Sequence, residues 1–174
     1  MQRRYPHQLS IGSHHTVVAL DEATVAKIFT DDIHSDIATE SAAMRFANDI
    51  NELVVKWVRN DFDEQLDADV LVMERLYAYD YRAFELEKRT LWLEAFEFEL
   101  RQLHESGWVH RKLYDAAGTA TTFFDNILLT QQGLRLIGIG QALLQQDTGD
   151  YLFEKHVRAE WEAVRLFKEY FLRR

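Results

Sequence analysis

The spacing of the apolar residues changes near Arg82, and this change limits the folds that the chain can adopt. Before Arg82, apolar and β-branched residues gather in short runs that are typical of strands. After it, apolar residues recur at intervals of seven, three, four and three, the spacing of one face of a helix: Leu86, Leu93, Phe96, Leu100 and Leu103. Strands that mostly precede helices predict an α+β fold.

The same patterns predict the individual elements. Asp21-Glu22 suits a tight turn, and Thr39 or Ser35 is suited to cap the first helix. In chain order we expect a hairpin over 9–29, a helix through 40–47, strands over 53–58 and 70–73 around an acidic turn at 61–69, a helix from about 82 to 107, a hairpin of 127–129 and 134–137, and a helix over 153–171.

Length and composition indicate one domain. The 174 residues, of which 47% are apolar, suffice for one packed core. Because the chain has no cysteine, disulfides, thiol nucleophiles and cysteine-based metal centres are excluded. No apolar run reaches the roughly 18–20 residues that a membrane span requires, and residues 1–15 lack the apolar stretch of a signal peptide. We therefore expect a soluble, cytoplasmic protein that does not bind a membrane.

The charge is unevenly distributed. The formal net charge is −9, and residues 1–87 carry 8 basic and 17 acidic side chains, whereas residues 88–174 carry 12 of each. An acidic field repels phosphate backbones, so we do not expect nucleic acid as a partner. The same field favours a basic protein partner.

One lysine stands in an apolar strand. Lys27 lies within Val25-Ala-Lys-Ile-Phe29, where an unpaired buried ammonium is costly. It therefore needs an anion or a carboxylate, and Glu40, 13 residues further on in the predicted helix, is the expected partner. A lysine at the exposed edge of the strand is the alternative.

Four further segments follow in an order that matches a known family. Leu71-Val-Met-Glu-Arg-Leu76 ends a strand, and Leu100 to Leu113 contains a turn at Gly107 before His110-Arg111. Asp125-Asn126 precedes the second hairpin, and Leu134-Arg-Leu-Ile-Gly-Ile-Gly140 ends it. Together with the Lys27 strand, they resemble the protein-kinase-like superfamily over about residues 9–140. The resemblance implies a two-lobed protein-kinase-like fold.

In that fold, residues 1–73 form a β-rich lobe, 74–77 a hinge and 78–174 a mainly helical lobe. Only residues 141–149 separate Gly140 from the last helix. The resemblance therefore implies a truncated C-terminal lobe that lacks the family's element for binding peptide substrates.

The resemblance also implies roles for individual residues. Lys27, with Glu40, would hold the phosphates of ATP or ADP, and the hinge at Glu74 and Leu76 would bind adenine through its backbone. Asn126 would be a ligand of Mg²⁺. His110 and Arg111 match the His-Arg of the family's catalytic loop.

Three parts depart from the family pattern. Lys112 stands at the catalytic aspartate, and an ammonium does not accept a proton at neutral pH unless its pKa falls by several units. Gly138 stands at the metal-binding aspartate, so Mg²⁺ binding is expected to be poor. The glycine-rich loop is reduced to Ile11 to Val17, with a single glycine.

An insertion is a fourth departure. The family spaces its catalytic-loop histidine and asparagine by seven residues, whereas His110 and Asn126 are 16 apart. The additional residues fall in 114–124, whose small side chains predict a mobile loop. Four nearby carboxylates are candidate substitutes, Asp115 and Asp125 for the catalytic base and Asp147 and Asp150 for the metal ligand.

The sequence therefore predicts a minimal pseudokinase, which binds and regulates a partner protein or associates with itself and retains some nucleotide binding. If Lys112 lies in the cleft, its charge offsets phosphate in place of a metal. The alternative is an atypical ATP-dependent phosphotransferase in which Asp115 or Asp125 replaces the missing aspartate. A third reading is an unrelated α+β binding domain.

Overall fold

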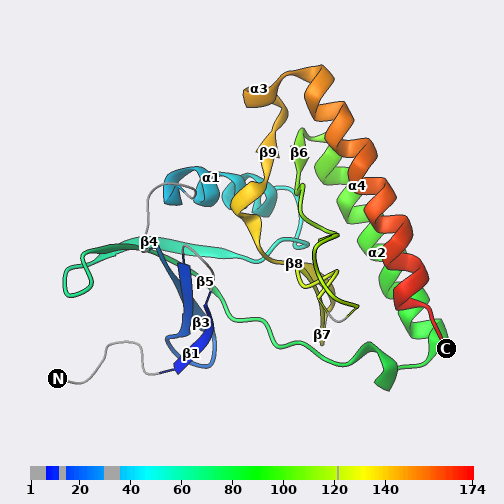
Figure 1. Ribbon diagram of the computed structural model, residues 1–174, viewed down its shortest axis with the longest axis horizontal. Coiled ribbons are helices and arrows are strands. Elements are labelled where there is room, and N and C mark those ends of the chain that lie inside the picture. The colour runs from blue at the N-terminus through cyan, green and yellow to red at the C-terminus, as the bar shows by residue number, and fades with distance from the viewer. Residues whose placement is uncertain (1–6, 12–14, 30–35, 121) are drawn as a thin grey trace.

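The computed structural model describes residues 7–11, 15–29, 36–120 and 122–174. Figure 1 shows an antiparallel sheet on one side of the molecule and two long helices, α2 (Leu86–Glu105) and α4 (Asp150–Phe171), packed side by side on the other. A third helix, α1 (Ile37–Asn48), lies against the sheet. The mixed α and β composition expected from the sequence is confirmed.

The main sheet has five antiparallel strands in the order β1-β2-β3-β5-β4. They are β1 (His7–Ile11), β2 (His15–Ala19), β3 (Thr24–Phe29), β4 (Trp57–Asp63) and β5 (Ala68–Glu74). Lys27 lies opposite Val17 on β2 and Leu71 on β5, so the three side chains share one face. Residues that alternate with them form a separate buried cluster: Val18, Ala26, Ile28, Ala68, Val70 and Val72.

The region predicted as a hairpin over 9–29 contains three strands. β2 and β3 form a hairpin around Asp21, whose carboxylate accepts hydrogen bonds from the N–H groups of Ala23 and Thr24 at 2.8 and 2.7 Å. The preceding strand, β1, pairs antiparallel with β2. The predicted single-glycine loop lies largely at residues 12–14, which are outside the described residues.

The N-cap of α1 is Asp36, so the prediction of Thr39 was wrong, and Ser35 lies outside the described residues. The Asp36 carboxylate accepts hydrogen bonds from the Thr39 hydroxyl and the Ala38 N–H, both at 2.9 Å. These bonds, the Thr39 bond most, lower the pKa of Asp36. Aspartate, serine and threonine all cap helices well, which is why the sequence pattern did not single out the right one.

The strand predicted over 53–58 overlaps β4 only at residues 57 and 58, and the acidic turn after it is shorter than predicted. β4 begins at Trp57 and runs through Asp63, and β5 starts at Ala68. Residues 53–55 are buried because they lie beside β8 (Gly133–Leu136) instead of joining the sheet. Leu136 donates its N–H to the Leu53 carbonyl at 2.8 Å, and Val55 donates to the Leu136 carbonyl at 2.8 Å.

The second half largely follows the predicted pattern. The predicted helices and hairpin correspond to α2, α4, and the pair of β7 (Ile127–Thr130) with β8. Short elements that the pattern did not predict are β6 (Trp108–Val109), β9 (Leu143–Leu144), α3 (Gln145–Thr148) and the 3₁₀ turns at Tyr81–Ala83 and Ile139–Gln141. Across the described ranges, no helix is long and apolar enough to cross a membrane.

Candidate functional site

A cavity of about 360 Å³ lies between the main sheet and the β7–β8 hairpin. This volume falls in the range of small-molecule sites, roughly 300–1,000 Å³. Seven residues singled out from the sequence line it: Lys27, Glu40, Glu74, Leu76, Asp125, Asn126 and Gly138. Apolar residues form most of the remaining wall, among them Val17, Val25, Met44, Val55, Met73 and Leu128. The fold thus brings together residues that are up to 122 positions apart in the sequence, Val17 and Ile139.

Lys27 and Glu40 form a buried ion pair in this cavity. The Lys27 ammonium lies 2.8 and 3.0 Å from the two oxygens of the Glu40 carboxylate, and the two side chains are only 9% and 3% exposed. Such a pair is tolerated in the interior only because each charge neutralises the other. A Cβ atom at Gly140 would lie 3.5 Å from Glu40 Oε2 and 3.8 Å from Lys27 Nζ, so the backbone after β8 passes close to the pair.

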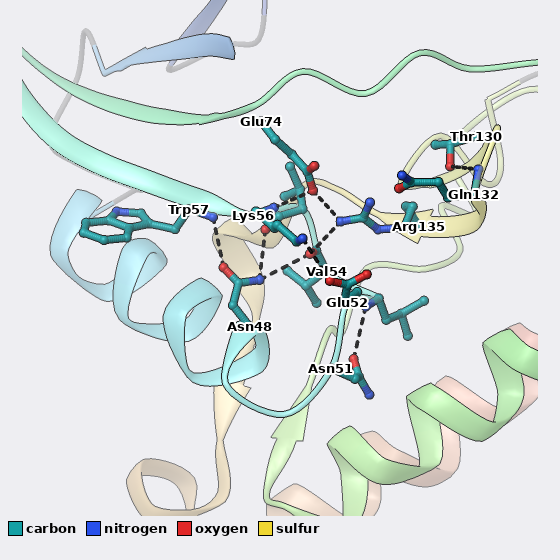
Figure 2. A network of polar contacts seen from close by, with 12 residues as sticks. Asn48, Asn51, Glu52, Val54, Lys56, Trp57, Glu74, Thr130, Gln132 and Arg135 are labelled. Atoms are coloured by element: carbon teal, nitrogen blue, oxygen red, sulfur yellow. Dashed lines mark hydrogen bonds and ion pairs between the residues drawn. The ribbon is translucent and has the colours of Figure 1, made fainter. Parts of the chain in front are cut away.

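The carboxylate of Glu74 has a structural partner. It accepts hydrogen bonds from the Arg135 guanidinium and, at 2.9 Å, from the Lys56 N–H. Figure 2 shows this contact at the centre of a polar network. The Glu74 charge is therefore already paired within the protein, next to Arg75 and Leu76, which also line the cavity.

Arg135 holds the two walls of the cavity together. This buried arginine on β8 also donates from Nη2 to the Val54 carbonyl at 3.2 Å. Asn48, at the end of α1, donates to the same carbonyl at 3.2 Å and accepts from the Trp57 N–H at 2.9 Å. The sheet, α1 and the hairpin are therefore tied at one point, as Figure 2 shows.

His110 is fully buried below the cavity. Its Nδ1 accepts from the Lys112 N–H at 3.0 Å, so its Nε2 carries the hydrogen and donates to the Ile137 carbonyl at 2.7 Å. Burial lowers the pKa of His110 and outweighs the opposing effect of Glu160. The neutral ring thereby links the loop at 110–112 to the backbone just before Gly138.

Glu160 on α4 is a residue that the sequence analysis missed. Its carboxylate, only 4% exposed as a residue, accepts from the N–H groups of His110 and Arg111 at 3.1 and 2.7 Å and contacts His104 Nε2 at 2.9 Å. Arg111 itself has a left-handed backbone, with φ of 74°. The sequence pattern could have indicated that Glu160 is buried, because it stands seven residues after Phe153 on the apolar face of α4.

Asn126 and Gly138 are in direct contact. Asn126 donates from Nδ2 to the Lys112 carbonyl at 2.9 Å, which directs its Oδ1 at Gly138. Gly138 has φ of 68°, and a Cβ atom there would overlap Asn126 Oδ1. The Asn126 amide therefore occupies the space that a side chain at 138 would enter, and it would have to shift to admit one. Among the described residues, no group of three or more acidic or histidine side chains is placed to hold a metal ion.

The insertion at 114–124 forms a closed turn in the residues that the structure describes. Asp115 donates its N–H to the Phe123 carbonyl at 2.9 Å, and the Tyr114 ring packs 5.4 and 5.5 Å from the rings of Phe123 and Phe124. Asp125, directly after it, lines the cavity. Burial, and secondarily the charge of Asp115, raise the pKa of Asp125.

The remaining candidate residues do not line the cavity. Asp147 and Asp150 stand in α3 and the first turn of α4, and Asp150 accepts from the Gln145 side chain at 2.9 Å. Neither they nor Lys112, Asp115, His110 and Arg111 belong to the lining of the 360 Å³ cavity. Of the two carboxylates proposed as a substitute base, the structure brings only Asp125 to the cavity.

The arrangement of the elements matches a solved kinase structure. The protein kinase PK-1 of Cydia pomonella granulovirus superposes with a TM-score of 0.58 over 80% of this chain, at 14% sequence identity. The fold is kinase-like. The chain spans 54% of the length of that kinase, and at this identity the likeness extends to the fold alone. No protein-family model matches the chain, and no curated protein matches it by sequence.

Proposed function

We propose that this kinase-like chain is a pseudokinase, a module with an impaired catalytic centre that acts by binding a partner protein. In this proposal residues 1–73 and 78–174 are two lobes, the second of them truncated, and 74–77 is the hinge. The observation that carries the proposal is that Gly138 has no side chain and that the Asn126 amide lies against it, so no carboxylate accompanies Asn126 there.

The chemistry of phosphoryl transfer explains why this matters. Transfer requires a positioned hydroxyl and the neutralisation of negative charge that spreads over the phosphoryl oxygens, mostly by Mg²⁺. Mg²⁺ prefers carboxylate oxygens in octahedral geometry, and the single amide oxygen of Asn126 is a poor substitute. Lys112 offers no proton acceptor at the position of the catalytic base.

The cavity supports residual nucleotide binding. Its volume and apolar wall suit an adenine ring, and Lys27 provides one cation near the place where phosphates would lie. Glu40 already neutralises that cation, however, and Asp125 adds a negative charge. We therefore propose weak binding of ATP or ADP that does not depend on Mg²⁺.

Thermal unfolding with ATP, ADP and AMP, each with Mg²⁺ and with EDTA, tests this proposal. Ligand at 100 times its Kd adds about 2.7 kcal/mol, or roughly 2–4 °C at this size. The control is the double variant Lys27→Met/Glu40→Leu, which removes the ammonium without leaving a lone buried carboxylate. A shift that EDTA leaves unchanged and the double variant loses supports the proposal, whereas a shift that requires Mg²⁺ contradicts it.

The partner is proposed from charge. The first 87 residues hold the whole net charge of −9, which favours a basic protein surface over a second copy of the same acidic chain. Sedimentation velocity over a concentration series, at low and high salt, tests this preference. A monomer throughout supports a different protein as partner, and a dimer that persists at high salt supports self-association.

One observation favours the alternative of an atypical phosphotransferase. Asp125 lines the same cavity as Lys27 and Asn126, and its raised pKa suits a group that accepts a proton. Hydrolysis of ATP or transfer to the chain itself, lost in Asp125→Asn and retained in Asp115→Asn, would establish this activity. Absence of turnover in the wild type, with nucleotide bound, supports the pseudokinase.

A further inference from the structure

A second cavity, of about 270 Å³, adjoins the first and shares Asp125 and Leu128 with it. It lies between α4, the β7–β8 hairpin and the segment before α2. Its wall is unusually aromatic, with six rings: Tyr79, Tyr81, Phe124, Phe167, Tyr170 and Phe171. None of the roles proposed above uses this cavity.

The rings form a packed wall. Tyr170 lies 5.2 Å from Tyr81 and 5.3 Å from Phe124, and Tyr81 lies 5.5 Å from Phe171, measured between ring centroids. Because the rings support one another, the wall is preorganised and a ligand need not order it. The faces of aromatic rings carry negative electrostatic potential and attract cations, most strongly where water is excluded.

The chain's own cations already use this property. The guanidinium groups of Arg82 and Arg89 lie 5.7 and 5.6 Å from the Tyr81 ring. Arg89 is buried and donates to the Phe171 and Arg173 carbonyls at 2.7 and 2.9 Å, and Arg82 pairs with Asp80 at 3.3 Å. Both arginines therefore have partners elsewhere, and in the described ranges no other ring of this wall has a cation over it.

The Asp125 carboxylate also lines this second cavity, and it has no cation partner among the described residues. The Asp125 side chain has neither a hydrogen bond nor an ion pair in the parts of the chain that the structure describes, and burial, with the charge of Asp115 second, raises its pKa. We propose that this second cavity binds a small organic cation, an ammonium or quaternary ammonium group, between the aromatic wall and Asp125. The class of ligand follows from the lining, because the rings and the carboxylate all favour positive charge.

The position of this cation has a consequence for the first cavity. This step rests on the proposed nucleotide binding. A cation beside Asp125 would offset phosphate charge in the first cavity, where Gly138 supplies no metal ligand. Cation and nucleotide should then strengthen each other's binding by the same factor, because coupling between two sites is reciprocal.

Titration calorimetry with the full chain tests the site. The probe is tetramethylammonium chloride, with sodium chloride at equal ionic strength and tert-butanol, a neutral molecule of similar shape, as controls. We expect tetramethylammonium to bind and tert-butanol to bind about tenfold more weakly or not at all. Equal binding of the two would overturn the proposal, because it would show an apolar site only.

Variants separate the residues of the site. Asp125→Asn should weaken tetramethylammonium binding about tenfold, and Asp147→Asn, an equal change of charge far from the cavity, should leave it unchanged. Tyr79 is 47% exposed, so Tyr79→Leu should fold and bind several-fold more weakly, whereas Tyr79→Phe retains the ring and the affinity. Unchanged binding in Asp125→Asn contradicts the proposal.

The nucleotide experiment keeps the two proposals apart. Lys27→Met/Glu40→Leu should lose nucleotide and retain tetramethylammonium. If tetramethylammonium fails to bind while nucleotide still does, the cation site is wrong and the nucleotide site stands. If tetramethylammonium binds and nucleotide does not, the cation site stands and the coupling between the two is wrong.

Discussion

The two walls of the first cavity hold their charges in opposite ways. On the wall formed by the sheet and α1, Lys27 and Glu40 are buried and neutralise each other. On the wall formed by the hairpin, Asp125 is exposed and has no cation partner among the described residues, and Gly138 has no side chain. The first wall is therefore complete without a ligand, whereas the exposed carboxylate of the second is solvated and is available to pair with a bound cation. The difference indicates that the cavity favours added positive charge.

The largest expected effect comes from removing one charge of the Lys27–Glu40 ion pair. Lys27→Ala leaves the Glu40 carboxylate buried without a partner, so the free energy of unfolding should fall by about 3–5 kcal/mol. Replacing both residues, in Lys27→Met/Glu40→Leu, should cost about 1 kcal/mol or less, because no lone charge remains. Chemical denaturation of the three proteins measures both values. An equal loss in the single and double variants would show that burial of the charge is not the cause.

The next largest effect concerns Glu160, which supports the loop at 110–111. Glu160→Ala removes the acceptor of two backbone N–H groups, those of His110 and Arg111, in a buried place. We expect a loss of about 2–4 kcal/mol, and a smaller loss in Glu160→Gln, whose amide oxygen still accepts a hydrogen bond. Denaturation in urea measures the loss, and equal stability of the two variants would contradict this role.

A smaller effect tests whether the second wall has room for a side chain. Gly138→Ala places a Cβ atom against Asn126 and should cost about 2 kcal/mol. In the background of Asn126→Ala the same change should cost about 1 kcal/mol less, since the clash is gone. A double-mutant cycle by thermal or urea unfolding measures this coupling, and additive costs would show that Asn126 is not the obstacle.

An aspartate at position 138 tests the same contact with Asn126. Gly138→Asp should be destabilised like Gly138→Ala and should not gain Mg²⁺ binding by calorimetry, because the Asn126 amide occupies the space that the aspartate would enter. A gain of Mg²⁺ affinity would show that the wall adapts.

The smallest effect concerns the unpaired charge. Because burial and Asp115 raise the pKa of Asp125, the folded protein holds this proton more tightly than the unfolded chain does. The resulting stability is present at pH values below the ordinary pKa of 3.8 and is lost as the pH rises through the folded value. Asp125→Asn should therefore be slightly more stable than the wild type at pH 7 and not at pH 3. Thermal unfolding at both pH values, with Asp147→Asn as the control, measures the difference.

Much of the fold could be predicted from the sequence because it depends on local spacing. The seven-, three- and four-residue intervals after Arg82 predicted α2 and α4, and a lysine in an apolar strand predicted a carboxylate partner, which proved to be Glu40. The boundaries of β4 could not be predicted, because apolar residues 53–55 look like a strand of the sheet but pair with β8.

The sequence by itself determined most of the strands and helices and the absence of cysteine chemistry. From the resemblance it also predicted that positions 112 and 138 depart from the kinase pattern. Only the tertiary structure decided that Glu160 supports the loop at 110–111, that Arg135 neutralises Glu74, and that Asp125 joins two cavities. These contacts link residues 49 and 61 positions apart in the first two cases. Local spacing specifies which face of an element is apolar, but a polar contact of this range depends on how the elements pack.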